Sequence, residues 1–169
     1  MTAAIVFWGA ALVAIVSTVF TVTGRNPVHA LLYLIVSLLA VAVIFFTYGA
    51  PFAALLEVIV YAGAILVLFV FVVMMLNLGD AAQQERKLLT PRIWVGPGVL
   101  SAILLAEVLA LMHQGTLDGH GGQLHAVGAE VTAKQVGIAL FGPYLLAVEL
   151  ASMLLLGALV AAYHLGRQE

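Results

Sequence analysis

The sequence predicts an all-α integral membrane protein with five transmembrane helices. This prediction rests on the amino-acid composition and on the lengths of the apolar segments. Of the 169 residues, 64% are hydrophobic and only 8% are charged, whereas about a quarter of the residues of a soluble domain are charged. The mean hydropathy is +1.20. Five apolar segments reach the roughly 20 residues that a helix needs to cross a bilayer. We therefore expect a single membrane domain over residues 1–169.

Charge and cysteine content exclude several kinds of function. The net charge of −2 argues against a nucleic-acid partner, because such partners need basic surfaces. The chain has no cysteine, which excludes disulfides, Cys-ligated zinc and Cys-ligated iron–sulfur clusters. The first apolar run has no basic region before it and no clear cleavage site, so we interpret it as a retained span rather than a signal peptide.

Proline and glycine mark the borders of the predicted spans. Asn26-Pro27 and Thr90-Pro91 each combine a capping side chain with a proline suited to the first helical position. Gly49-Ala50-Pro51 predicts a tight turn. The spans are expected at residues 3–22, 27–48, 52–78, 91–113 and 143–163.

The segment before the fifth span, residues 114–134, is polar and glycine-rich and is expected to be a loop. Thr132 and Gln135 have the spacing of a capping box, which would start a short helix that ends at Phe141. Gly142-Pro143 then separates this helix from the fifth span.

The basic residues predict an orientation, because cytoplasmic flanks of membrane helices collect lysine and arginine. Lys134 stands alone in the two loops on one side. The opposite side holds the other five of the six basic residues, which are Arg25, Arg86, Lys87, Arg92 and Arg167. The N-terminus is therefore expected outside and the C-terminus in the cytoplasm.

Three glutamates, Glu57, Glu107 and Glu149, lie inside predicted spans. A charged group at mid-membrane costs at least about 2.5 kcal/mol, so such residues are candidates for proton paths. Counting residues places all three in the outer half of the membrane. The alternative is a neutral acid, or one that is hydrogen-bonded to a neighbouring helix. We favour this alternative for Glu107, which is the weakest candidate.

The third span contains two further unusual residues, Tyr61 and Gly63. Tyr61 follows Glu57 by four residues, a spacing that places both on one helical face. The 27 residues from 52 to 78 would measure about 40 Å as an α-helix, against a hydrocarbon core of about 30 Å. Such a helix must tilt, extend beyond the core, or absorb residues in a distortion such as a π-bulge. Gly63 fits either a distortion or close helix packing.

Three segments resemble a known family. They are residues 26–39 (NPVHALLYLIVSLL), 56–78 (LEVIVYAGAILVLFVFVVMMLNL) and 140–160 (LFGPYLLAVELASMLLLGALV). In sequence and in order they are similar to the J subunits of the bacterial proton-pumping NADH:quinone oxidoreductase, respiratory complex I. Residues 56–78 form the most specific of these motifs.

The resemblance implies a multi-pass subunit of the bacterial inner membrane that binds no cofactor itself. FMN, the iron–sulfur clusters, NADH and the quinone would lie in other subunits of the electron-transport complex. The expected partners are the small K and A membrane subunits, the H subunit that forms the quinone site, the antiporter-like N subunit and the lipid bilayer.

The resemblance also implies roles for residues of the third span. Tyr61, Ala62 and Gly63 would form a helix that switches between bulged and regular geometry and links quinone reduction to proton translocation. Glu57 would join an intramembrane polar path, with Glu149 as a second candidate.

Two other classes of membrane protein stay open at the level of the sequence. Related subunits occur in multisubunit cation/proton antiporters and in membrane-bound hydrogenases, but residues 26–34 and 141–156 favour the NADH enzyme. An independent channel or carrier is disfavoured, because the chain lacks the paired inverted halves of many carriers.

Overall fold

The structure, a computed structural model, describes residues 2–24, 26–76, 91–117 and 131–167. Over these ranges all the regular secondary structure is helical, and five helices are long and apolar enough to cross a membrane. The predicted fold class is therefore confirmed. The chain divides into two units at residues 130 and 131, and each unit is described by itself. The single domain expected from the sequence stays a prediction.

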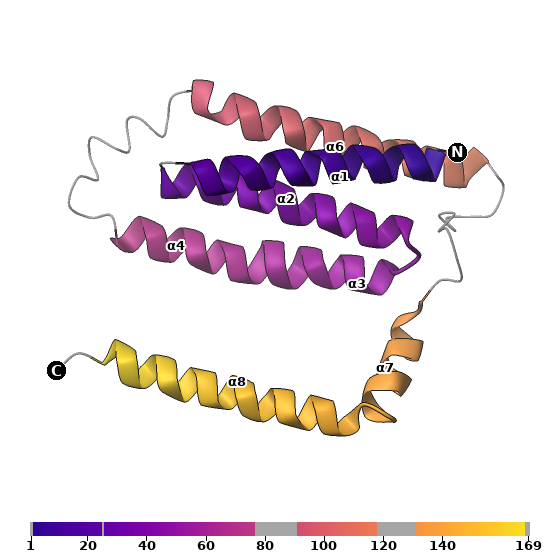
Figure 1. The fold of residues 1–169 in the computed structure, drawn as a ribbon. Helices are drawn as coiled ribbons and strands as arrows, with labels where there is room; N and C mark the ends of the chain where they lie inside the picture. The colour runs from indigo at the N-terminus through magenta and orange to yellow at the C-terminus, as the bar shows by residue number, and fades with distance from the viewer. Residues whose placement is uncertain (1, 25, 77–90, 118–130, 168–169) are drawn as a thin grey trace. The chain divides into compact units, whose positions relative to one another are not determined.

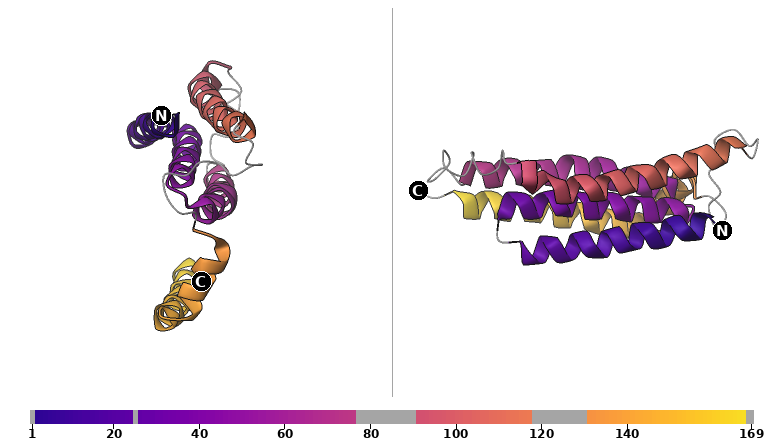
Figure 2. Two further views of the ribbon diagram at one scale, coloured as in Figure 1. Left: turned by 90° about the vertical axis from the view of Figure 1, so that its right-hand side faces the viewer. Right: turned by 90° about the horizontal axis from the view of Figure 1, so that it is seen from above.

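The first unit is a bundle in which α2 is the central helix (Figures 1 and 2). This helix contacts α1, α3, η1, α4 and α6, and α1 also packs against α6. The elements are α1 (Thr2–Thr23), α2 (Pro27–Thr47), α3 (Pro51–Leu56), the π-helix η1 (Glu57–Ile65), α4 (Leu66–Leu76) and α6 (Pro91–Leu117). The elements α3, η1 and α4 follow one another without a break and together form the third span.

The predicted start of α2 and the predicted turn between α2 and the third span are confirmed in atomic detail. The Asn26 side chain accepts hydrogen bonds from the backbone N–H groups of Val28 (3.0 Å) and His29 (3.5 Å), and Pro27 opens the helix. After α2, Gly49 adopts a positive φ of 77°, which glycine tolerates because it has no Cβ. Pro51 then begins α3. The predicted cap at Thr90 and the last two residues of the predicted third span lie outside the described residues.

The fourth span is longer than the sequence predicted. The helix α6 continues from Pro91 to Leu117, so residues 114–117 are helical although the sequence placed them in a loop. It also runs through Pro97, a residue that removes one backbone N–H and is tolerated in membrane helices when neighbouring groups compensate. The most apolar part of α6, Trp94–His113, agrees with the predicted span end.

Small side chains allow α1 and α2 to approach closely. Ala10 and Ala40 are completely buried, and together with Val13, Val36 and Leu104 they form the core between α1, α2 and α6. Beside this core, the hydroxyls of Thr18 and Ser37 are hydrogen-bonded to each other across the helix pair (2.8 Å). Such packing replaces the hydrophobic effect, which gives no driving force between helices in lipid.

The contact between α2 and α6 depends on Gly96. The buried Tyr33 ring stacks on Phe20 of α1, with ring centroids 5.0 Å apart, and its hydroxyl lies against the Gly96 backbone. A Cβ at position 96 would overlap this hydroxyl. The stacked ring leaves the hydroxyl little room to move aside.

The second unit consists of α7 (Ala133–Phe141) and α8 (Leu145–Gly166). The predicted capping box is present: the Thr132 hydroxyl accepts from the Gln135 N–H (3.4 Å), and the Gln135 side chain accepts from the Thr132 N–H (3.0 Å). A turn over residues 142–144 separates the two helices, as the Gly142-Pro143 pair predicted. The fifth span is α8, which begins two residues later and ends three residues later than expected.

The Gly96 contact yields the first prediction. Gly96→Ala should destabilise the protein by about 1–3 kcal/mol, because the added methyl group forces an overpacked contact with Tyr33. Gly98→Ala is the matched control, since no described residue lies within 4 Å of a Cβ at that position of the same helix. The measurement is the midpoint of thermal unfolding in detergent, together with the level of the chain in membranes. Equal midpoints for the two variants would show that the Tyr33 contact is not tight.

Candidate functional site

The third span changes its hydrogen-bonding pattern in its middle. The N–H of Glu57 still donates to the carbonyls of Ala53 and Ala54, as in an ordinary helix. At the other border, the N–H of Leu66 donates to the carbonyl of Tyr61, five residues earlier. Between them lie the nine residues of η1, which are π-helical. The resemblance implied a helix that can bulge at Tyr61–Gly63, and the structure contains a longer π-helical segment, Glu57–Ile65, around these residues. Such segments are rare and often occur at functional sites.

The predicted switch residues differ in their surroundings. Ala62 is buried, on a segment that packs against α2. Tyr61 is 52% exposed, and its hydroxyl makes no hydrogen bond with the described residues. A tyrosine hydroxyl in a membrane needs a partner, and the described part of this chain does not provide it.

Within the described residues, no other helix packs closely against Gly63. A Cβ at this position would meet only the carbonyl oxygen of Val58 within 4 Å, at a distance of 3.1 Å, among the described residues. Val58 lies five residues before Gly63, which is the hydrogen-bond spacing of a π-helix. The glycine therefore relieves crowding inside η1 itself, so of the two roles that the sequence left open the structure favours the distortion.

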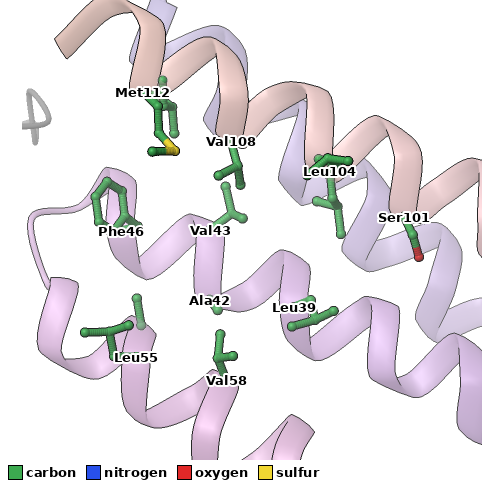
Figure 3. Close-up of a pocket in the computed structure, with 13 residues that line it drawn as sticks. Leu39, Ala42, Val43, Phe46, Leu55, Val58, Ser101, Leu104, Val108 and Met112 are labelled. Atoms are coloured by element: carbon green, nitrogen blue, oxygen red, sulfur yellow. The ribbon is translucent and has the colours of Figure 1, made fainter. Parts of the chain in front are cut away.

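Glu57 is the first residue of η1 and is partly exposed. Its carboxylate makes no hydrogen bond or ion pair within the described ranges. Val58, the next residue, lines an apolar groove between α3–η1, α2 and α6, with Val108 of α6 on its opposite wall (Figure 3). Glu57 and Glu107 directly precede these two valines, so they occur at the same end of the bundle.

Glu107 has a contact that the sequence could not show. Its carboxyl group lies against the backbone of Gly9 in α1, where an added Cβ would overlap one carboxyl oxygen. The other oxygen, Oε2, is buried and lacks a hydrogen-bond partner among the described residues. Gly9 was not singled out from the sequence, since a glycine in an apolar run carries no signal of what faces it. The contact places the Glu107 carboxyl between α6 and α1, and its part in a proton path stays a prediction.

Glu149 lies on α8, and its side chain is exposed in the second unit. The hydroxyl of Ser152 donates to its backbone carbonyl (2.7 Å), whereas the carboxylate has no partner within the described part of the chain. No residue of α8 is buried. A transmembrane helix that carries an acid on a bare surface needs a neighbour that satisfies the acid.

The groove beside η1 does not resemble a cofactor site. It has a volume of about 490 Å³, and Ser101 is the only polar residue in its wall. Across the described residues, no group of three or more His, Cys, Asp or Glu side chains could hold a metal ion. The candidate site of the first unit therefore consists of the π-helix η1 with Glu57 and of Glu107 on α6, whereas Glu149 belongs to the second unit.

Fold and site together define a multi-pass membrane protein with a π-helical third span. The sequence profile of the NADH-ubiquinone/plastoquinone oxidoreductase chain 6 family matches residues 17–165. The chain belongs to this family and is a membrane subunit of NADH:quinone oxidoreductase, respiratory complex I. It is part of an enzyme complex, as the resemblance had implied.

Bacterial relatives support this assignment over nearly the whole chain. The chain is 63% identical to NADH-quinone oxidoreductase subunit J of Pseudomonas aeruginosa, over 96% of each sequence. It is 56% identical to the subunit J of Escherichia coli K12, over 96% of this chain and 86% of the relative. Identity to the subunit J of Buchnera aphidicola subsp. Baizongia pistaciae is 37%, over 95% and 96%.

The geometry at Gly63 yields the second prediction. Gly63→Val should lower quinone-linked turnover, because a branched side chain crowds the Val58 carbonyl and penalises the π-helical state. A shift of about 1.4 kcal/mol between two helix states would change their ratio tenfold. The measurement is NADH:quinone turnover in membranes with matched amounts of assembled complex.

The matched control for this substitution is Gly98→Val, at a helical glycine with open space around it. Ala62→Val is less suitable, since Ala62 is buried and a larger side chain would overpack its contact. Normal assembly and parental turnover of Gly63→Val would mean that the switch does not need this glycine.

Proposed function

We propose that this chain couples quinone reduction to proton translocation through a change in the hydrogen bonding of η1. The observation that carries the proposal is the nine-residue π-helix that begins at Glu57 in the middle of a transmembrane span. Each residue of an α-helix turns the chain by about 100°. If a helix takes up one residue more or fewer in a segment, the part after that segment therefore rotates by about this angle relative to the part before it. A change between π and α geometry would therefore reorient Glu57 and Tyr61 relative to α4.

The proposed change is compatible with the membrane. In hydrocarbon each backbone N–H and C=O must keep a hydrogen bond within the protein. A π-helix satisfies these groups by bonds to the fifth residue back, and an α-helix by bonds to the fourth. Both states of η1 therefore keep their backbone paired, and Gly63 lowers the crowding that the π-helical state brings near Val58.

We further propose that Glu57 and Glu149 belong to an intramembrane polar path, with Glu107 as a third and weaker member. The support is that the carboxylates of Glu57 and Glu149 have no partner among the described residues. Acids in membranes usually face protein or water rather than lipid. Other subunits would provide that environment, and we expect these to be the small K and A subunits, the H subunit at the quinone site and the antiporter-like N subunit.

The redox chemistry would lie in other subunits. The chain has no cysteine for an iron–sulfur cluster. We propose that FMN, the iron–sulfur clusters, NADH and the quinone bind elsewhere in the complex, and that this chain contributes a moving helix and protonatable side chains. The alternative of an antiporter or hydrogenase subunit has less support, because the relatives described above carry the name of the NADH enzyme.

The orientation in the bacterial inner membrane is the third prediction. The excess of basic residues on one side favours a periplasmic N-terminus and a cytoplasmic C-terminus. A fluorescent protein fused after Arg167 should therefore fluoresce, and alkaline phosphatase at the same place should be inactive. Fusions after Thr132 should give the opposite pattern. Active phosphatase after Arg167 would reverse the orientation.

The fourth prediction tests the proposed function at Glu57. Glu57→Gln keeps the shape of the side chain and removes its ionisation. Quinone-linked proton pumping should fall, whereas oxidation of NADH by a soluble artificial acceptor should persist, because the redox groups lie elsewhere. The measurements are both activities and the pumped proton gradient in membrane vesicles with equal amounts of complex.

Glu57→Asp is the matched variant for this test, since it retains a carboxyl group and should retain more pumping than Glu57→Gln. Parental pumping in Glu57→Gln would remove Glu57 from the proton path. Loss of the artificial-acceptor activity in an assembled complex would contradict the proposed division of labour.

A further inference from the structure

The helices α7 and α8 are joined by a hydrogen-bonded corner. The N–H of Tyr144 donates to the carbonyl of Ala139 (3.2 Å), and the N–H of Leu145 donates to the carbonyl of Gly142 (3.3 Å). A Cβ at position 142 would lie 2.7 Å from the carbonyl oxygen of Ile138, so the corner needs glycine. Figures 1 and 2 show that α7 runs across the axis of α8. The corner fixes this arrangement within the second unit.

The corner determines where α7 lies relative to the bilayer. The 22 residues of α8 measure about 33 Å, which is enough to cross a hydrocarbon core of about 30 Å. A helix that runs across the end of a spanning helix must lie along the membrane surface. With nine residues α7 is far too short to span.

One side of α7 is entirely apolar, and the two polar side chains of the helix lie outside it. One face has no polar side chain and follows the helical pattern i, i+3, i+4, i+7, i+8 with Ala133, Val136, Gly137, Leu140 and Phe141. We call it the apolar face of α7. Leu140 is 42% and Phe141 73% exposed in the second unit. The other side of the helix carries Gln135, Ile138 and Ala139, and Lys134 lies at the edge between the two.

We propose that α7 binds the lipid bilayer as an interfacial anchor, with its apolar face on the acyl-chain boundary and Lys134 at the phosphate level. An amphipathic helix of this kind lies in the interface plane. Lys134 can bury its aliphatic stem beside Phe141 while its ammonium group reaches the headgroups. The exposed Tyr144 at the corner lies at the same level, where tyrosine is enriched in membrane proteins.

The position of Lys134 favours lipid over a partner protein as the occupant. It lies seven residues before Phe141, so the cation and the most exposed apolar side chain project from the same side of the helix. A bilayer interface offers acyl chains and anionic phosphates one above the other, which matches this pair. A partner subunit would have to supply both an apolar groove and a separate group for the ammonium.

The absence of cysteine from the chain permits a direct test. Leu140→Cys and Ile138→Cys are matched single-cysteine variants, because both parental side chains are apolar and exposed but, two residues apart, they point in different directions. Complex carrying either variant is placed in nanodiscs of phosphatidylethanolamine and phosphatidylglycerol. It is then treated with a charged maleimide or with a membrane-soluble one. The mass of this chain, separated after the reaction, reports its labelling.

We expect the charged maleimide to label Ile138→Cys faster than Leu140→Cys by about tenfold or more, because a charged reagent is excluded from the acyl-chain region. A charge at mid-membrane costs at least about 2.5 kcal/mol, and about 1.4 kcal/mol already corresponds to a factor of ten. The membrane-soluble maleimide should label both. Equal labelling by the charged reagent would place α7 in water and overturn the proposal. Protection of Leu140→Cys from both reagents would mean that a protein subunit covers the face, which also overturns it. Phe141→Cys, on the same face, replaces Leu140→Cys if that variant does not assemble.

Discussion

The constraint on which the rest of this structure depends is that no water is available inside the bilayer to pair with the backbone. Every N–H and C=O group within a span must be bonded inside the chain or to a neighbour, which restricts the spans to helices. The segment η1 meets this constraint by a change of acceptor from the fourth to the fifth residue back, so the span remains helical while its register changes. A feature that alters register without breaking the backbone network is well suited to a moving part in a membrane.

Close contact between helices follows from the same environment. Lipid tails are as apolar as leucine, so association of helices relies on packing and on polar contacts between helices. The core between α1 and α2 uses completely buried alanines, and α6 is placed by two glycines that receive polar groups. The Tyr33 hydroxyl lies against the backbone of Gly96, and the Glu107 carboxyl lies against the backbone of Gly9. The bundle around α2 is thus formed largely by small residues.

The membrane acids explain why the chain is a subunit rather than an independent protein. The carboxylates of Glu57 and Glu149 and the hydroxyl of Tyr61 make no hydrogen bond within the described residues, and α8 buries no residue in its own unit. An acid left without a partner in a membrane is expensive. The chain is one subunit of a larger complex, so it has partner subunits beside these groups' own chain.

The sequence by itself determined the fold class, the five spans, the caps at Asn26 and Thr132 and the family, because these depend on local composition, on hydrogen bonds between near neighbours and on contiguous motifs. It also pointed to the region of η1, since the third span resembles the J subunits around Tyr61 and Gly63 and is longer than a straight crossing of the membrane needs. Only the tertiary structure showed that Gly63 faces the Val58 carbonyl, that Glu107 lies on Gly9 and that Tyr33 lies on Gly96. The last two contacts join residues more than 60 positions apart, and the first depends on a π-helical register. Apolar periodicity does not record what faces a residue across a helix pair, and in a chain with so many small apolar residues many packings satisfy the same pattern.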